Sequence, residues 1–153
     1  MIPAIKAFRP EAGSSIHLDG WREVTRVDGY EIKVVLKGGL EDLPTNKKLF
    51  FINLGGYQSG KLEEQYHIIL SVYDDQVHAT DEAKKGVFYK TNTLNGAGSH
   101  IDEKHGVDVD DIYRIEKILL PEYKNKFHIV ITPATDSFQD TVQLGYFKLD
   151  KIK

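Results

Sequence analysis

Residues 17–32 read HLDGWREVTRVDGYEI and residues 100–115 read HIDEKHGVDVDDIYRI, so one pattern occurs twice, 83 positions apart. Six of the sixteen aligned positions are identical, whereas unrelated segments share about one by chance. The identical pairs are His17/His100, Asp19/Asp102, Val24/Val107, Asp28/Asp111, Tyr30/Tyr113 and Ile32/Ile115. We interpret the pattern as an internal repeat, which predicts two related structural units and indicates no particular reaction.

Segments outside the two copies also carry the alternation or the short apolar runs that are typical of β-strands. They are residues 48–54 (KLFFINL), 66–73 (YHIILSVY), 127–132 (FHIVIT) and 142–149 (VQLGYFKL). We expect the last two segments to form a closing strand pair. Residues 80–85 (TDEAKK) predict a short N-capped helix, and the opening residues predict the last turns of another helix that stops near Pro10 and Gly13.

Asp28 and Gly29 lie between the two strands expected in the first copy, and this dipeptide is typical of a two-residue hairpin turn. The second copy has Asp111 and Ile112 at the same positions. A β-branched residue strongly resists the positive φ that such a turn requires. We therefore expect both copies to share a bend or a bulge, in which Gly29 has no special role.

Together these elements predict an α+β protein of two related units, with mainly antiparallel sheet and few helices. Residues 1–40 are expected to form an incomplete first unit, a helix tail followed by two strands. Residues 47–120 are expected to form a complete second unit, and residues 121–153 to contribute the closing strand pair on the same body. Because the first unit lacks its leading strands, its sheet edge is expected to be completed either by the C-terminal strands or by a second chain. We favour the second chain and therefore expect a homodimer.

Composition excludes several classes of function. The 153 residues include no cysteine, so a disulfide framework and a thiolate metal site are both impossible. The formal net charge of −3 comes from interspersed charges, which argues against a nucleic-acid partner. The longest apolar runs are too short to cross a bilayer, and the N-terminus lacks the pattern of a secretory signal. We expect a cytoplasmic protein with no membrane partner, and no cofactor is indicated.

Four stretches resemble a small bacterial family catalogued as domain of unknown function fifteen-forty-three. They are residues 5–35, which include the first copy, KLFFINLGGYQSG (48–60), SHIDEKHGVDVDDIYRIEKIL (99–119) and LGYFKL (144–149). The resemblance implies one or two copies of the domain and no established activity. In the two-copy pattern a strand and loop precede the first copy. Their absence here suggests a truncated gene product, a shortened start site or an artificial boundary.

Residues 55–61 (GGYQSGK) follow an apolar strand and fit the first seven positions of a phosphate-binding loop. Leu62 stands where that motif has the hydroxyl residue that holds Mg²⁺. The chain then leads into a predicted strand instead of a helix whose N-terminus could hold phosphate. We interpret this segment as a hairpin connection.

A cluster of acidic residues and histidines in the second copy contains ligand types suited to a divalent metal. Its weak candidates are His100, Asp102, His105 and Asp108. The first copy has Arg22 and Thr25 at the positions of His105 and Asp108, so a site that uses all four residues would exist in one copy only. A solvated charged face is the more common outcome for such a cluster.

The residues that recur in both copies are the better candidates for a ligand-binding site. They are His17, Asp19, Asp28, Tyr30, His100, Asp102, Asp111 and Tyr113. A carboxylate that pairs with an imidazole could prepare it as a general base. The alternative, which we favour, is structural, because Asp commonly caps turns and strand ends and Tyr commonly buries its ring.

The sequence supports two classes of function and identifies no catalytic residue. The favoured hypothesis is a non-enzymatic binding or interaction module that self-associates and recognises a small molecule or a protein. The alternative is a small metal-assisted or acid–base hydrolase that uses the His-x-Asp and Asp-x-Tyr positions.

Overall fold

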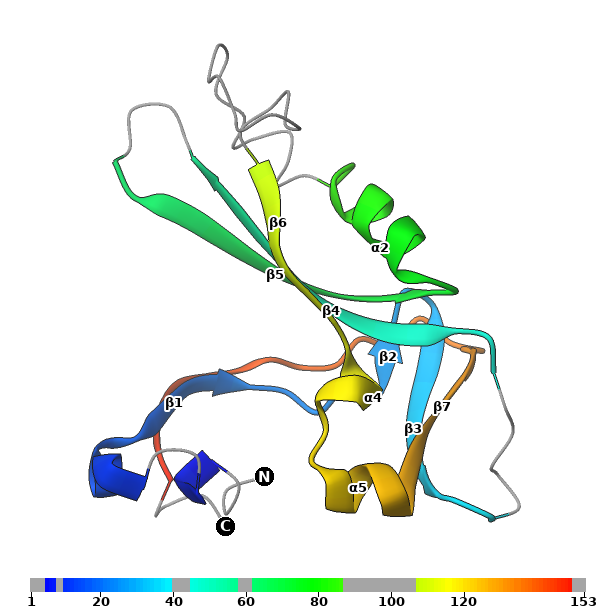
Figure 1. Ribbon diagram of the computed structural model, residues 1–153, viewed down its shortest axis with the longest axis horizontal. Helices are drawn as coiled ribbons and strands as arrows, with labels where there is room; N and C mark the ends of the chain where they lie inside the picture. Colours follow the sequence, from blue (N-terminus) through cyan, green and yellow to red (C-terminus); the bar gives the residue numbers. More distant parts are fainter. Residues whose placement is uncertain (1–4, 8–9, 40–44, 58–61, 87–106, 150–153) are drawn as a thin grey trace. The chain divides into compact units, whose positions relative to one another are not determined.

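The computed structural model describes residues 5–7, 10–39, 45–57, 62–86 and 107–149 (Figure 1). It comprises two compact units. The first contains residues 1–25 together with 138–153, and the second contains residues 26–137. Most described strands are antiparallel and helices are few, which confirms the predicted α+β class.

In the first unit, residues 5–7 are helical and a 3-10 helix, η1, covers Pro10–Ser15. The backbone is non-helical at Gly13, with φ of 52° and ψ of −123°, and this residue is one of the two stops that the sequence predicts. Strands β1 (His17–Trp21) and β8 (Gln143–Lys148) pair antiparallel, with an irregularity between Leu18 and Gly20. Gly20 is needed there because an added Cβ would lie 3.0 Å from the Leu144 side chain and 3.1 Å from the Gln143 carbonyl oxygen.

The second unit contains two three-stranded sheets. The first sheet has the order β2-β3-β7, formed by β2 (Arg26–Val27), β3 (Tyr30–Leu36) and β7 (Phe127–Pro133). The second has the order β5-β4-β6, formed by β4 (Lys48–Tyr57), β5 (Glu64–Tyr73) and β6 (Val107–Arg114). The predicted C-terminal pairing is wrong, because β7 pairs with β3 and β8 pairs with β1.

Helix α2 (Gln76–Ala83) lies against one face of the β5-β4-β6 sheet, and together they form the main core (Figure 1). Phe50, Ile52 and Leu54 alternate along β4 and meet the small side chains Ala79 and Ala83 of the helix. This spacing puts all three β4 side chains on the same face of the strand. Because both helix contacts are alanines, the helix backbone can approach the sheet closely.

Helix α2 begins five residues earlier than the sequence predicts. Its N-cap is Asp75, whose carboxylate accepts a hydrogen bond of 2.9 Å from the backbone N–H of His78. Thr80, the predicted cap, lies inside the helix and its hydroxyl donates to the carbonyl oxygen of Gln76. Two further short helices, α4 (Ile115–Ile118) and α5 (Pro121–Lys126), connect β6 to β7.

The turn between β2 and β3 corrects the prediction that Gly29 has no special role. Val27 pairs directly with Tyr30, and Asp28 and Gly29 both have positive φ, of 51° and 78°. This is a tight two-residue hairpin, in which glycine supplies the left-handed conformation at no steric cost. The expected bulge occurs in the second copy only, where the β4–β6 register shifts between Asn53 and Leu54.

No helix among the described residues is both long and apolar enough to span a membrane.

Candidate functional site

The recurring residues of the first copy fall into different units. His17 and Asp19 belong to β1 in the first unit, whereas Asp28 and Tyr30 belong to the β2–β3 hairpin in the second.

His17 and Asp19 form an exposed ion pair, with 3.2 Å between Nε2 and Oδ1. The other ring nitrogen of His17, Nδ1, lies 3.4 Å from the carbonyl oxygen of Ser15, and the ring stacks on Tyr146 at 4.0 Å between centroids. Both ring nitrogens thus face acceptors. In this arrangement neither nitrogen is directed toward a substrate proton, as a general base requires.

Asp28 makes a structural contact between the two sheets of the second unit. Its carboxylate accepts a hydrogen bond of 2.9 Å from the backbone N–H of Val72 on β5. Val72 is buried, so this amide has a partner where water has little access.

Tyr30 follows the turn that carries Asp28, and its ring is half-buried with the Lys47 ammonium 5.8 Å from the ring centroid. A hydrogen bond to Asp74 is the main cause that raises the pKa of Lys47. Tyr30 thus contributes an aromatic face to a cation that is already paired.

Asp111 and Tyr113 of the second copy lie on β6, on the sheet face opposite α2. The Tyr113 hydroxyl donates a hydrogen bond of 2.8 Å to Asp111 Oδ1, and this bond is the main cause that raises the pKa of Tyr113. Tyr113 is 42% exposed, and its ring lies 6.4 Å from that of Phe51 on β4. The pair lies on a solvent-exposed face of the sheet.

The metal candidates His100, Asp102 and His105 lie outside the described residues. Asp108 belongs to β6, where it pairs with Gly55 of β4. Among the residues that the structure describes, no group of three His, Asp or Glu side chains could hold a metal ion.

The resemblance of residues 55–61 to a phosphate-binding loop has a structural explanation. Strand β4 continues through Gly55 and Gly56, and its last residue, Tyr57, pairs with Glu64 of β5. The segment therefore connects two antiparallel strands, as the hairpin interpretation predicts.

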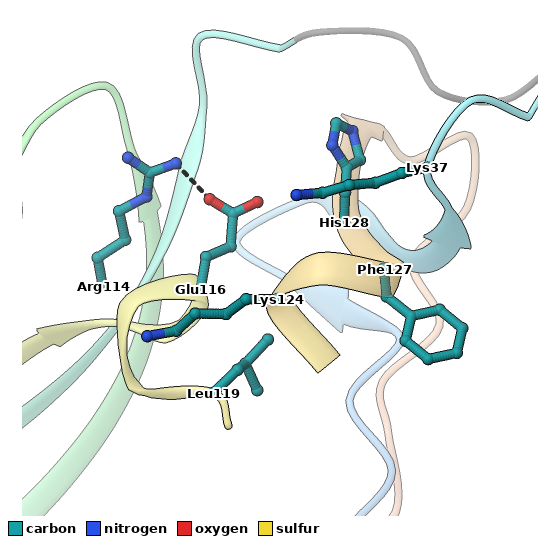
Figure 2. A pocket seen from close by; sticks show the side chains of 7 residues that line it. All are labelled: Lys37, Arg114, Glu116, Leu119, Lys124, Phe127 and His128. Carbon is teal, nitrogen blue, oxygen red and sulfur yellow. Dashed lines mark hydrogen bonds and ion pairs between the residues drawn. The ribbon is translucent and has the colours of Figure 1, made fainter. Parts of the chain in front are cut away.

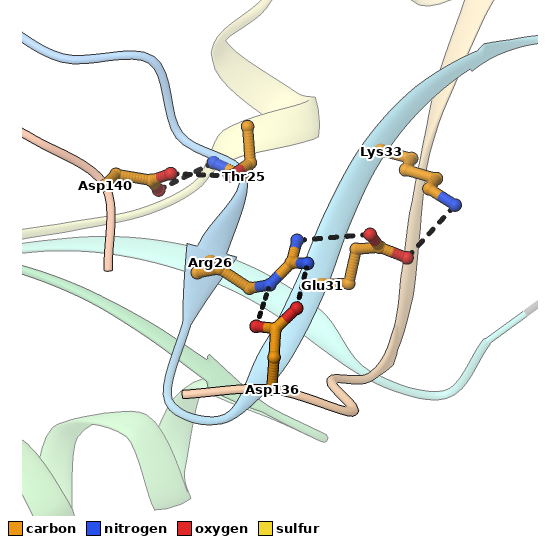
Figure 3. A network of polar contacts seen from close by, with 6 residues as sticks. All are labelled: Thr25, Arg26, Glu31, Lys33, Asp136 and Asp140. Atoms are coloured by element: carbon orange, nitrogen blue, oxygen red, sulfur yellow. Dashed lines mark hydrogen bonds and ion pairs between the residues drawn. The ribbon is translucent and has the colours of Figure 1, made fainter. Parts of the chain in front are cut away.

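An ion-pair network fixes the start of β2 to the segment after β7 (Figure 3). The Arg26 guanidinium holds both carboxylate oxygens of Asp136, at 3.2 Å and 3.1 Å, and also contacts Glu31 at 3.1 Å. Lys33 approaches the other oxygen of Glu31 at 3.0 Å. The hydrogen bond from Lys33 is the main cause that lowers the pKa of Glu31, with Arg26 adding to it.

In the first unit, Asp140 fixes the end of the segment that follows β1. Its two carboxylate oxygens accept bonds of 2.7 Å and 2.6 Å from the backbone N–H and the hydroxyl of Thr25 (Figure 3). These two hydrogen bonds thus join residues that are 115 positions apart in the sequence.

A pocket of about 330 Å³ lies where α4 and α5 meet the end of β3 and the start of β7 (Figure 2). It is lined by Lys37, Arg114, Glu116, Leu119, Lys124, Phe127 and His128. Sequence analysis missed this pocket because its residues come from separate segments. The sequence does carry one signal near this pocket. When the repeat alignment is extended by one position, Glu31 aligns with Arg114 and Lys33 aligns with Glu116, so the sign of the charge is reversed at both positions.

Comparisons with known proteins give a family match and no activity. No curated protein and no solved structure matches the chain significantly. The sequence model of the family described as Domain of Unknown Function (DUF1543) matches residues 1–34, a segment that includes the first copy of the repeat.

Proposed function

We propose that this protein is a non-enzymatic interaction module that self-associates as a homodimer through the edge of β5. The observation that carries the proposal is the exposed apolar edge of this strand. Tyr66 and Ile68 are 60% and 62% exposed on β5, which is an outer strand of its sheet (Figure 1). The bacterial cytoplasm is the location that the sequence predicts for this module.

Strand β5 lacks the features that usually protect a sheet edge. Its ten residues, EQYHIILSVY, contain no lysine, no arginine and no proline. Long edge strands without such residues readily pair with another chain. The backbone N–H of Val72 points to Asp28 and thus away from β4. Because the direction of the backbone N–H and C=O groups repeats every two residues along a strand, the backbone groups of Ile68 and Leu70 also point away from β4.

A second copy of the chain is the partner that fits this edge. Antiparallel pairing about a two-fold axis at Ile68 puts Ile68 opposite its own copy and Tyr66 opposite Leu70 of the partner subunit. All three side chains lie on the sheet face that also carries Phe51 and Tyr113, so the apolar surfaces of the two copies become continuous.

The Asp28–Val72 bond limits how far this pairing extends. Because Asp28 occupies the outward N–H of Val72, a second β5 strand cannot pair beyond Leu70. The pairing is thus confined to the segment around Ile68, which defines its register.

The test is the molar mass in solution at micromolar concentration, measured by light scattering after size-exclusion chromatography. We expect a dimer for the wild-type chain and a monomer for Ile68→Lys, which places two like charges at the symmetry axis. Ile68 is largely exposed, so circular dichroism should show an intact fold.

The matched control is Val77→Lys on α2. Val77 is 69% exposed, close to the exposure of Ile68, and it lies on the helix instead of the sheet edge. This variant should remain dimeric. A monomeric wild-type chain, or an Ile68→Lys variant that stays dimeric, would refute the proposal.

The hydrolase alternative gains no specific observation from the described residues. His17 faces an acceptor on each ring nitrogen, and Asp28 serves the backbone of Val72. It therefore stays a prediction of the sequence.

A further inference from the structure

We propose that the pocket lined by Lys37, Arg114 and Lys124 binds a small oxyanion, either a phosphate group or a carboxylate of a metabolite-sized molecule. This binding site goes beyond the self-association proposed above and does not depend on it.

The size and the walls of the pocket suit a small molecule. Its volume of about 330 Å³ lies at the lower end of the range for ligand sites in proteins. Leu119 and Phe127 provide apolar lining, whereas the remaining lining side chains are charged or are histidine. Ligand sites commonly combine apolar walls with a few polar groups that fix orientation.

The charges of the pocket favour an anion. Three cationic side chains, Lys37, Arg114 and Lys124, share the lining with one carboxylate, that of Glu116. Glu116 forms an ion pair with Arg114 (Figure 2), so two lysine charges are left without compensation within the pocket. Near an enclosed surface, charges of one sign concentrate oppositely charged ligands.

The two lysines retain donors for a ligand. No described carboxylate lies within ion-pair distance of either ammonium group. Lys124 donates one hydrogen bond, to the carbonyl oxygen of Lys117, and the ammonium of a lysine has three donors. In Figure 2 the Lys37 side chain points toward Glu116.

Arg114 supplies a second, independent observation. Its Nε is buried and has no hydrogen-bond partner, while Nη2 is engaged by Glu116. A buried donor without an acceptor costs free energy, and most such groups in proteins have a partner. An oxygen of a bound anion would provide the missing acceptor and form a charge-assisted hydrogen bond.

The test is isothermal titration calorimetry of the full chain at low ionic strength with sodium phosphate, sodium sulfate and sodium citrate. We expect saturable binding of at least one of these anions. Preference for phosphate and sulfate identifies a phosphoryl ligand, and preference for citrate identifies a carboxylate ligand. Absence of saturable binding for all three anions would overturn the proposal.

Variants connect the binding to this pocket. Lys37→Gln and Lys124→Gln should each weaken binding by about tenfold, because each removes a charge-assisted contact. Glu116→Gln should strengthen it several-fold, because it removes the competing carboxylate and releases Arg114. Lys33→Gln is the control: Lys33 is an exposed lysine of β3 outside the pocket, and its loss should leave the affinity unchanged.

The Glu116→Gln variant distinguishes a ligand site from a purely structural cluster. If the Arg114–Glu116 pair serves only to hold α4 against β6, this variant lowers the melting temperature and does not strengthen anion binding. That result, or wild-type affinity in both lysine variants, would overturn the proposal.

Discussion

The contact between Asp28 and Val72 allows a quantitative test of whether a residue retained in both copies serves the fold. Asp28 has two roles in the structure. It adopts a left-handed backbone, with φ of 51°, and its carboxylate is the acceptor for the buried N–H of Val72. Substitution by Asn, Gly and Ala separates these roles.

The expected costs follow from what each substitution keeps. Asp28→Asn retains an acceptor and tolerates positive φ, so it should cost about 1 kcal/mol or less. Asp28→Gly keeps the backbone freedom and leaves the Val72 amide without a partner, at about 2 kcal/mol. Asp28→Ala adds a left-handed penalty of roughly 1 kcal/mol, for a total of about 3 kcal/mol.

The assay is urea unfolding followed by circular dichroism, which reports the loss of secondary structure. The expected order of unfolding free energies is wild type, Asn, Gly and Ala, from the most to the least stable. If Asp28→Gly unfolds at the wild-type urea midpoint, the bond to Val72 contributes no stability. The recurrence of this aspartate would then need a functional reason.

Two further predictions concern the core and the ion pairs of the second unit. Ile52 is fully buried between β4 and α2, so Ile52→Ala should cost about 3 kcal/mol in urea unfolding, and a cost below about 1 kcal/mol would contradict the core assignment. The pKa of Glu31 is lowered in the folded protein, mainly by the hydrogen bond from Lys33. Ionised Glu31 therefore stabilises the fold at pH values above its ordinary pKa of 4.5, and this stabilisation is lost as the pH falls through the lower pKa of the folded state. The urea midpoint of the wild-type chain should therefore fall more steeply on acidification below about pH 4.5 than that of Glu31→Gln, and parallel curves would contradict this reasoning.

The strands were predictable from the sequence because their signal is local. Along β4, the short apolar run of residues 49–52 indicates a strand in the sequence itself, and the structure buries Phe50, Ile52 and Leu54 on one face of this strand. Partner choice is not local. The segments that form β7 and β8 look like a hairpin pair, yet each finds its partner in the first 36 residues, over 90 positions away along the chain.

The start of α2 was missed because its first turn carries no apolar pattern. Gln76, Val77 and His78 are all exposed, and only Ala79 and Ala83 contact the core. The signal that decides the start is the N-cap Asp75, and it is a weak one because aspartate is also common in turns. Thr80 is a residue type that favours the N-cap position, but it lies about one turn inside the helix, where its hydroxyl donates to the carbonyl oxygen of Gln76. It therefore predicts the helix start at the wrong residue.

The repeat itself shows why identical residues need not form equivalent sites. Asp28 caps a buried amide from a tight turn, whereas its counterpart Asp111 accepts the hydroxyl of Tyr113 on an open strand. A short carboxylate can accept from either donor, so it is retained although the backbones differ.

The charge reversal next to these positions is more informative about function. Glu31 and Lys33 form an ion pair across Ile32 on β3, and the aligned Arg114 and Glu116 form one across the end of β6 with the signs exchanged. In the first copy the cation of the pair is exposed to solvent, whereas in the second the guanidinium lines a pocket that two lysines share. The same two positions therefore hold a surface pair in one copy and part of a cationic pocket in the other. A site for an anion can arise in this way in only one of the two copies, without any change in the residues that both retain.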